Sequence, residues 1–188
     1  SPATPQLIRG AMGQLGCEMI QLYGLTEATA GWLSFLQHED HLKALDGRPE
    51  LLSSCGRPAL HVDLSIRGDD GAELAVGEVG EIWVQGTVNT PGYLNRPEEN
   101  AELFSGAWLR THDLGRIDDE GYYWIIGRSK DVIISGGENI YPAELENVLA
   151  DCPQIAEAAV IGVPDAKWGE SVLVFAVKKE NSNLDEKA

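Results

Sequence analysis

A run of short strand-like segments separated by tight turns occupies the middle of the chain, from about residue 60 to residue 126. Residues 62–66 alternate apolar and polar side chains, which indicates a strand with one buried face. Tight turns of the types Asp-Asp-Gly and Asp-Glu-Gly stand at 69–71 and 119–121. Further strands are expected at 81–85, 108–110, 114–117 and 122–126, and a helix is expected to begin at Pro97. The pattern predicts a small, mostly antiparallel β unit.

The two flanks of this β unit show different patterns. On the amino-terminal side we expect a helix over 5–15 and a short buried strand over 18–22. On the carboxyl-terminal side the pattern predicts strands at 132–134, 156–162 and 172–178, a helix opened by Pro142, and the start of another helix over 180–188. The order β-α-β-β is typical of a small α+β domain, and we place a domain boundary near Lys130.

The charge balance excludes several classes of partner. The 188 residues carry 14 Lys and Arg against 30 Asp and Glu, a net charge of -16. A surface this acidic repels nucleic acid and anionic lipid, so we expect neither as a partner. No apolar stretch approaches the roughly 20 residues that span a bilayer, and the first residues do not resemble a secretory signal.

The three cysteines, Cys17, Cys55 and Cys152, are far apart and form no Cys-x-x-Cys pair. This spacing argues against a disulfide framework and against a zinc site. Free thiols fit a reducing compartment, so we expect a cytoplasmic protein.

Four segments have the residue types of a chemical site, although each has an ordinary structural explanation when taken alone. They are Tyr-Gly-Leu-Thr-Glu at 23–27, Trp-Leu-Arg-Thr-His-Asp at 108–113, Gly-Arg-Ser-Lys-Asp at 127–131 and Ser-Gly-Gly-Glu-Asn-Ile-Tyr-Pro at 135–142. A strand-end turn, a hairpin edge, a linker and a glycine turn would account for them in that order. The last one also lacks the spacing of a phosphate-binding P-loop.

Together, and in this order, the four segments resemble the acyl-adenylating superfamily, which includes acyl-CoA synthetases, luciferases and the adenylation domains of peptide synthetases. Residues 80–86, 92–98 and 121–128 are also similar to that family, so the resemblance covers nearly the whole chain. The stretch Ser-Gly-Gly-Glu-Asn-Ile-Tyr-Pro-Ala-Glu-Leu-Glu at 135–146 looks more like the CoA ligases than like peptide synthetases.

The resemblance implies a mixed α/β fold in two domains. Residues 1–129 would be the C-terminal part of a large adenylate-forming domain, ending in a β-barrel-like subdomain at about 58–129. Residues 130–188 would be a truncated α+β lid domain. The implied activity is ATP-dependent ligation of a fatty or general carboxylic acid to CoA through an acyl-adenylate, with ATP/AMP, Mg²⁺ and CoA as cofactors. Oligomers are compatible with this reading.

The resemblance also assigns roles to single residues of the nucleotide site. Tyr23, followed by Gly24, would stack near the adenine, and an aromatic face suits a base. Thr26 would hydrogen-bond the α-phosphate, and Glu27 would help to hold Mg²⁺. Asp113 would accept hydrogen bonds from the ribose hydroxyls, and Arg128 would contact the same sugar.

A second set of roles concerns movement of the lid. Lys130 matches the hinge about which the small domain of the family rotates between the two half-reactions. That rotation would bring Gly136 and Gly137 to the thiol channel, where glycines let the pantetheine arm pass close to the backbone.

Two departures from the family pattern stand out. His112 occupies a position that is usually glycine, so it requires a permissive backbone conformation or crowds the backbone. The family's phosphate loop and its lid lysine are expected before Ser1 and after Ala188, so we expect the chain to be inactive alone. A non-catalytic nucleotide- or partner-binding module, or an adenylation domain that loads a carrier protein, remains an alternative.

Overall fold

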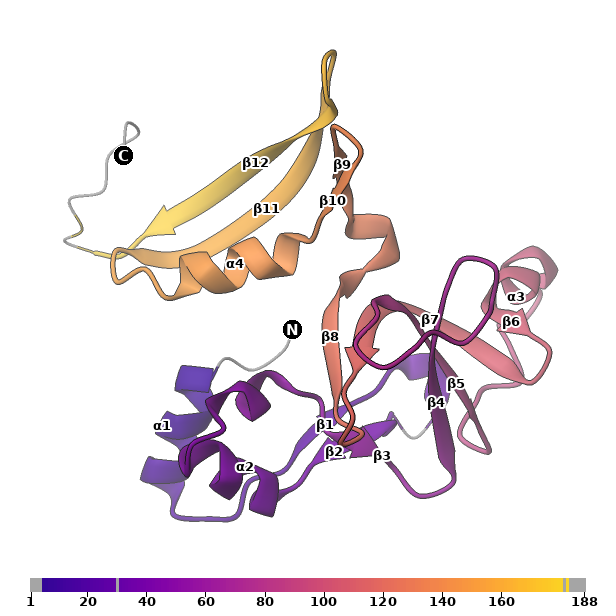
Figure 1. The fold of residues 1–188 in the computed structure, drawn as a ribbon, viewed down its shortest axis with the longest axis horizontal. Coiled ribbons are helices and arrows are strands. Elements are labelled where there is room, and N and C mark those ends of the chain that lie inside the picture. Colours follow the sequence, from indigo (N-terminus) through magenta and orange to yellow (C-terminus); the bar gives the residue numbers. More distant parts are fainter. Residues whose placement is uncertain (1–4, 30, 181, 183–188) are drawn as a thin grey trace. The chain divides into compact units, whose positions relative to one another are not determined.

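The computed structural model describes residues 5–29, 31–180 and 182, and Figure 1 shows the ribbon. The chain folds as two compact units, Ser1–Ile125 and Ile126–Ala188. Among the described helices, none is both long and apolar enough to cross a membrane.

The first unit begins with a helical part. Helix α1 (Pro5–Leu15) has the predicted bounds. Helix α2 (His38–Leu45) and the short 3-10 helix η2 (Pro49–Ser53) were not predicted. Leu36, Leu51, Leu52 and Tyr122 form the fully buried centre of the apolar cluster in this part.

A three-stranded antiparallel sheet follows, with the order β1-β2-β3. Its strands are β1 (Gln21–Tyr23), β2 (Ser34–Leu36) and β3 (Arg57–Pro58), and the 3-10 helix η1 (Thr26–Ala28) lies between β1 and β2. The prediction of a buried strand at 18–22 was wrong, because the strand is shorter and ends at Tyr23. Its side chains alternate between faces, so Leu22 is 55% exposed while Tyr23 is buried.

The predicted antiparallel β unit is confirmed as a five-stranded sheet with the order β4-β5-β7-β6, with β8 paired to β7. Its strands are β4 (Val62–Arg67), β5 (Gly80–Gly86), β6 (Phe104–Ser105), β7 (Trp108–Ile117) and β8 (Tyr123–Arg128). Helix α3 (Pro97–Leu103) begins at the predicted proline. The two strands predicted at 108–110 and 114–117 are one continuous strand, β7.

The second unit opens with the end of β8, continues with the 3-10 helix η3 (Ser129–Asp131) and holds a four-stranded antiparallel sheet with the order β10-β9-β12-β11. Its elements are β9 (Ile133–Ser135), β10 (Glu138–Ile140), α4 (Pro142–Ala150), β11 (Ile155–Asp165) and β12 (Gly169–Lys178). Helix α4 packs along β11 (Figure 1). The helix predicted over 180–188 lies, except for residues 180 and 182, outside the described residues.

A buried carboxylate ties α2 to the turn between β7 and β8. Asp40 is 4% exposed and accepts hydrogen bonds from the Tyr122 hydroxyl at 2.6 Å and from Lys43 Nζ at 2.8 Å. It also accepts one from the backbone N–H of Gln37 at 3.2 Å, within a capping box at the start of α2. Burial alone would raise the pKa of Asp40, but the hydrogen bonds from Lys43, Tyr122 and Gln37 outweigh it and lower that pKa.

This arrangement predicts a pH-dependent stability that a single substitution weakens. A carboxylate whose pKa is lower in the folded state stabilises the fold above its unfolded pKa, and this stabilisation is lost as pH falls through the folded pKa. We expect Asp40→Asn to lower the free energy of unfolding at neutral pH by about 1–3 kcal/mol and to flatten its fall below about pH 4. Urea denaturation followed by circular dichroism across a pH series measures both effects.

The matched control for that experiment is Asp119→Asn, because the Asp119 side chain is exposed. It should leave both the neutral stability and the acid slope close to those of the unchanged chain. An acid slope in Asp40→Asn equal to that of the unchanged chain would contradict the role assigned to this carboxylate.

Candidate functional site

Two predicted site residues, 90 positions apart, meet in the core of the first unit. The Tyr23 hydroxyl, at the end of β1, donates a hydrogen bond of 2.8 Å to Oδ2 of Asp113 in β7. Both residues are buried, with 8% and 7% exposure. Burial and the negative charge of Asp113 raise the pKa of the Tyr23 hydroxyl far above its usual value, so it stays a neutral donor. Tyr23 therefore orients Asp113, and its stacking on an adenine stays a prediction.

The backbone around Asp113 is irregular. In the pairing of β5 with β7, Trp83 lies opposite Arg110 and Glu81 lies opposite Leu114. Three residues of β7, 111–113, thus face one residue of β5, which makes a bulge with two extra residues. The Thr111 hydroxyl closes it, donating to the Ile82 carbonyl at 2.7 Å and accepting from the Asp113 N–H at 3.1 Å. Bulges of this kind re-aim side chains next to functional sites, and here the re-aimed side chain is Asp113.

His112, at the centre of the bulge, has a φ of 60°. This left-handed conformation favours glycine, because a Cβ costs about 1–2 kcal/mol there. On the sequence alone, His112 is expected to require a permissive backbone conformation or to crowd the backbone. The structure shows the first outcome, because His112 adopts the left-handed conformation that glycine prefers.

The Tyr-Gly-Leu-Thr-Glu segment continues from β1 into a tight loop. A Cβ on Gly24 would lie 1.1 Å from the carbonyl oxygen of Gly31. The backbone at Gly24 and the backbone at Gly31 therefore approach too closely for any side chain at residue 24. The Leu33 N–H donates to the Tyr23 carbonyl at 2.8 Å and closes the loop at its base. An open hollow of about 460 Å³ lies over the loop and is lined by Gly24, Leu25, Thr26, Thr29 and Gly31.

Glu27 stands in this loop, and the segment 88–93 contacts the loop at three positions, two of them on Glu27 and one on Thr29. The Tyr93 hydroxyl donates a short hydrogen bond to Oε1 of Glu27, and the Thr90 N–H donates to the Glu27 carbonyl at 2.7 Å. The Thr29 hydroxyl donates to the Val88 carbonyl at 2.8 Å. The bond to Glu27, together with burial, raises the pKa of Tyr93 to about 12, so this donor also stays neutral.

An oriented carboxylate of this kind suits Mg²⁺. Mg²⁺ that accompanies a nucleotide takes one or two protein carboxylates and completes its shell with phosphate oxygens and water. Glu27 in the loop fits that donor set. Sequence reasoning missed Tyr93 and Thr90 as partners of Glu27, although Tyr93 lies in the segment 92–98 that carries part of the resemblance.

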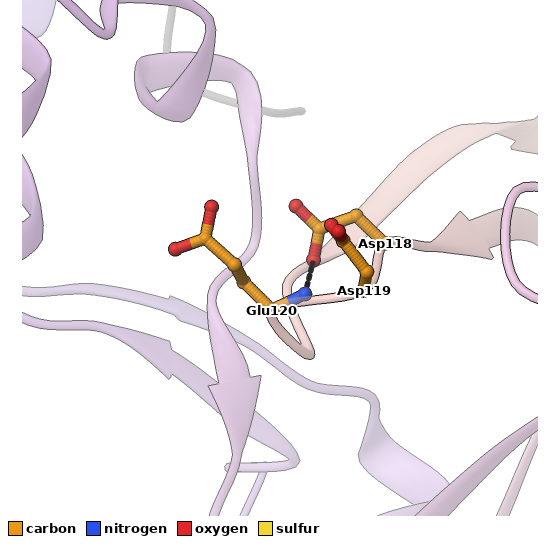
Figure 2. Close-up of side chains that lie close together, drawn as sticks. All are labelled: Asp118, Asp119 and Glu120. Carbon is orange, nitrogen blue, oxygen red and sulfur yellow. Dashed lines mark hydrogen bonds between the residues drawn. The ribbon is translucent and has the colours of Figure 1, made fainter.

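A cluster of three acidic residues lies at a turn, and hydrogen bonds within that turn explain its position. Asp118, Asp119 and Glu120 bring their carboxylates together at the turn between β7 and β8, and they are the one such acidic cluster among the described residues (Figure 2). Asp118 Oδ1 accepts from the backbone N–H groups of Glu120 at 3.0 Å and Tyr122 at 2.8 Å. Glu120 in turn pairs with Arg48. The Asp118 and Glu120 carboxylates thus have structural partners at this turn, so we assign no metal to the cluster.

The remaining predicted residues lie in the second unit. Arg128 ends β8, and Lys130 is exposed within η3. Gly136 and Gly137 form the turn between β9 and β10, with φ of 61° and 90°. A Cβ on Gly136 would lie 2.8 Å from the ring of Trp168, whose carbonyl accepts the Gly136 N–H at 2.8 Å. The packing of Trp168 explains this glycine, and its role at a thiol channel stays a prediction.

Comparison with known families gives two matches along the chain. Residues 1–94 match the AMP-binding enzyme family, and residues 144–188 match the AMP-binding enzyme C-terminal domain. The first match contains Tyr23, Thr26 and Glu27.

Individual relatives agree with these matches. The medium/long-chain-fatty-acid–CoA ligase FadD8 of Mycobacterium tuberculosis is 38% identical over 188 residues, which is 100% of this chain and 32% of that protein. The structure of amide bond synthetase McbA from Marinactinospora thermotolerans has a TM-score of 0.86 and 38% identity, covering 98% of this chain and 36% of McbA. The chain thus spans about a third of the length of these relatives.

A third relative has been solved with ligands. O-succinylbenzoate CoA synthetase (MenE) from Bacillus subtilis, in complex with the acyl-adenylate intermediate OSB-AMP, has a TM-score of 0.84 and 37% identity. That comparison covers 96% of this chain and 35% of MenE. Another structure of the same synthetase holds ATP and a magnesium ion.

The close approach of Gly24 to Gly31 predicts opposite outcomes for two glycine substitutions. Gly24→Ala should lower the free energy of unfolding by about 3 kcal/mol, because the new methyl group displaces the backbone of the loop. Gly10→Ala should raise it by up to about 1 kcal/mol, because nothing lies within 4 Å of a Cβ at that position of α1 and alanine favours helix. Urea denaturation of the two variants measures both. Equal effects would contradict the tight-loop geometry.

Proposed function

Because this chain belongs to the AMP-binding enzyme family, we propose that it forms part of an ATP-dependent acid–thiol ligase acting on a carboxylic acid and CoA. The observation that supports the proposal most is the convergence of the two motifs at the buried bond between Tyr23 and Asp113. That bond fixes an acidic side chain in the same unit as the exposed Thr26 and the oriented Glu27.

In the proposed first half-reaction a carboxylate oxygen attacks the α-phosphorus of ATP, giving an acyl-adenylate and releasing pyrophosphate. Asp113 accepts hydrogen bonds from the ribose hydroxyls, and Arg128 contacts the same sugar. The Thr26 hydroxyl donates to an α-phosphate oxygen, where negative charge must be stabilised. These contacts position the phosphorus for attack, and orientation of two bound reactants supplies much of the rate gain in such reactions.

Glu27 is the proposed ligand for Mg²⁺. The ion, when bound, neutralises phosphate charge and polarises the phosphoryl group. The hydrogen bond from Tyr93 holds the carboxylate in one orientation, as the outer-shell partners of metal ligands commonly do.

In the proposed second half-reaction the CoA thiol attacks the acyl carbon, giving a thioester and AMP. We propose a large-domain part over 1–129 and a lid over 130–188, with Lys130 as hinge and Gly136 and Gly137 near the thiol. The exposed position of Lys130 in η3, close to the start of the second compact unit, is consistent with this role.

The proposed function also covers the identity of the carboxylic acid substrate and of the group that accepts the acyl chain. FadD8 is named for fatty acids, MenE for o-succinylbenzoate and McbA for amide bonds, so the family varies both substrates. We propose a fatty or general carboxylic acid and CoA, in the cytoplasm, with the full reaction requiring residues beyond these 188. Loading of a carrier protein and a non-catalytic binding role are the alternatives.

The protein that contains this chain should convert one acid of a graded panel to acyl-CoA, with AMP formed in equal amount, when given ATP, Mg²⁺ and CoA. Glu27→Gln should reduce that turnover by at least about tenfold, because an amide is a weaker ligand for a hard cation. Chromatography that resolves AMP and acyl-CoA measures both products.

Each other outcome identifies a different function. Release of AMP or pyrophosphate without acyl-CoA would indicate a carrier protein or an amine as acceptor. Absence of turnover with every acid, in conditions where a known ligase works, would contradict the ligase assignment and favour the binding role.

A further inference from the structure

A buried glutamate outside the predicted site residues faces the bulge that carries Asp113. Glu81, in β5, is 8% exposed. Its Oε2 accepts from Trp83 Nε1 at 3.0 Å and from Arg110 Nε at 3.0 Å and Nη2 at 2.8 Å. Its Oε1 accepts from the backbone N–H of His112 at 3.0 Å and lies 3.1 Å from His112 Nδ1. Both carboxylate oxygens are therefore engaged, each by a different part of β7.

The donors on Oε2 are themselves fixed. The Arg110 guanidinium lies over the Trp83 ring at 5.5 Å from its centroid. Arg67 lies over Trp83 at 5.1 Å and over Trp108 at 4.5 Å. Stacked cations and rings of this kind hold one another in place, so the side chain of Glu81 has a single defined orientation.

The contact on Oε1 of Glu81 fixes the backbone rather than a side chain, because its donor is the backbone N–H of His112. The bulge takes the His112 N–H out of the regular pairing between β5 and β7, and its partly buried bond to Glu81 replaces the lost partner. His112 is also held at a φ of 60°, which a non-glycine residue adopts only when its surroundings impose it. Glu81 accepts this N–H directly beside Asp113.

We propose that Glu81 is a positioning residue of the nucleotide site, which holds the backbone of His112 so that the Asp113 carboxylate is aimed at the ribose hydroxyls. The inference rests on the proposed function, since it assigns to Asp113 the ribose contact. An Arg110–Glu81 ion pair would need only one carboxylate oxygen. The second oxygen, directed at the backbone of the bulge, makes Glu81 part of the support for Asp113.

The test compares AMP with 2′,3′-dideoxy-AMP, which lacks both hydroxyls, in binding titrations of the protein that contains this chain. The unchanged chain should bind AMP roughly tenfold or more tightly than the dideoxy analogue, because hydrogen bonds to a charged group are strong. Glu81→Gln should reduce this ratio to about one while leaving the affinity for the dideoxy analogue within about twofold. A glutamine has one acceptor oxygen and cannot serve Arg110 and the His112 N–H together.

Asp63→Asn, an exposed carboxylate of β4 in the same sheet, is the matched control and should keep the full ratio. If Glu81→Gln does not fold, as judged by circular dichroism, Arg110→Gln gives the second test. It loosens the anchor on Oε2 and should reduce the ratio at least threefold.

The possible results distinguish failure of the ribose role of Asp113 from failure of the positioning role of Glu81. A ratio of one in the unchanged chain, or no binding of either nucleotide, would overturn the ribose role of Asp113 and the inference with it. A tenfold ratio that persists in the folded Glu81→Gln variant would overturn the positioning role alone. Loss of affinity for both nucleotides by the same factor would also overturn it, since that result indicates a general structural effect.

Discussion

The hydrogen bond between Tyr23 and Asp113 is the contact on which the arrangement of the candidate site depends. It joins the end of β1, in the three-stranded sheet, to the bulge of β7, in the five-stranded sheet. The bond is buried, so water does not compete for either partner and a missing partner would be costly. Two motifs that are remote in the sequence are thereby joined in a defined geometry.

Around this bond, further contacts fix the backbone and side chains of each motif. Gly24 and Gly31 allow the loop to close, the segment 88–93 fixes Glu27, and Glu81 supports the bulge. Preorganisation of this kind suits a reaction in which positioning and charge stabilisation do most of the work. The family to which the chain belongs, and the acyl-adenylate bound to its relative MenE, agree with such a reaction.

Much of the fold could be predicted because it follows local signals. The alternation at 62–66, the turn at 69–71 and the prolines at 97 and 142 predicted elements that the structure confirms. Helix α2 escaped prediction because it buries Asp40, His41 and Ala44 while Leu42 and Leu45 are exposed, so its buried face does not follow the apolar pattern. Capping and the hydrogen bonds of Asp40 stabilise it instead. The bulge at 111–113, the φ of His112 and the partners of Glu27 depend on contacts between distant segments, which no local pattern encodes.

A double-mutant cycle on Tyr23→Phe and Asp113→Asn tests most directly whether the two motifs are physically joined. The free energies of unfolding of the unchanged chain, both single variants and the double variant give the coupling between the side chains. The account predicts a coupling of about 1–3 kcal/mol, as for a buried hydrogen bond to a charged group. Effects that add within about 0.5 kcal/mol would contradict it, because the motifs would then be adjacent without stabilising each other.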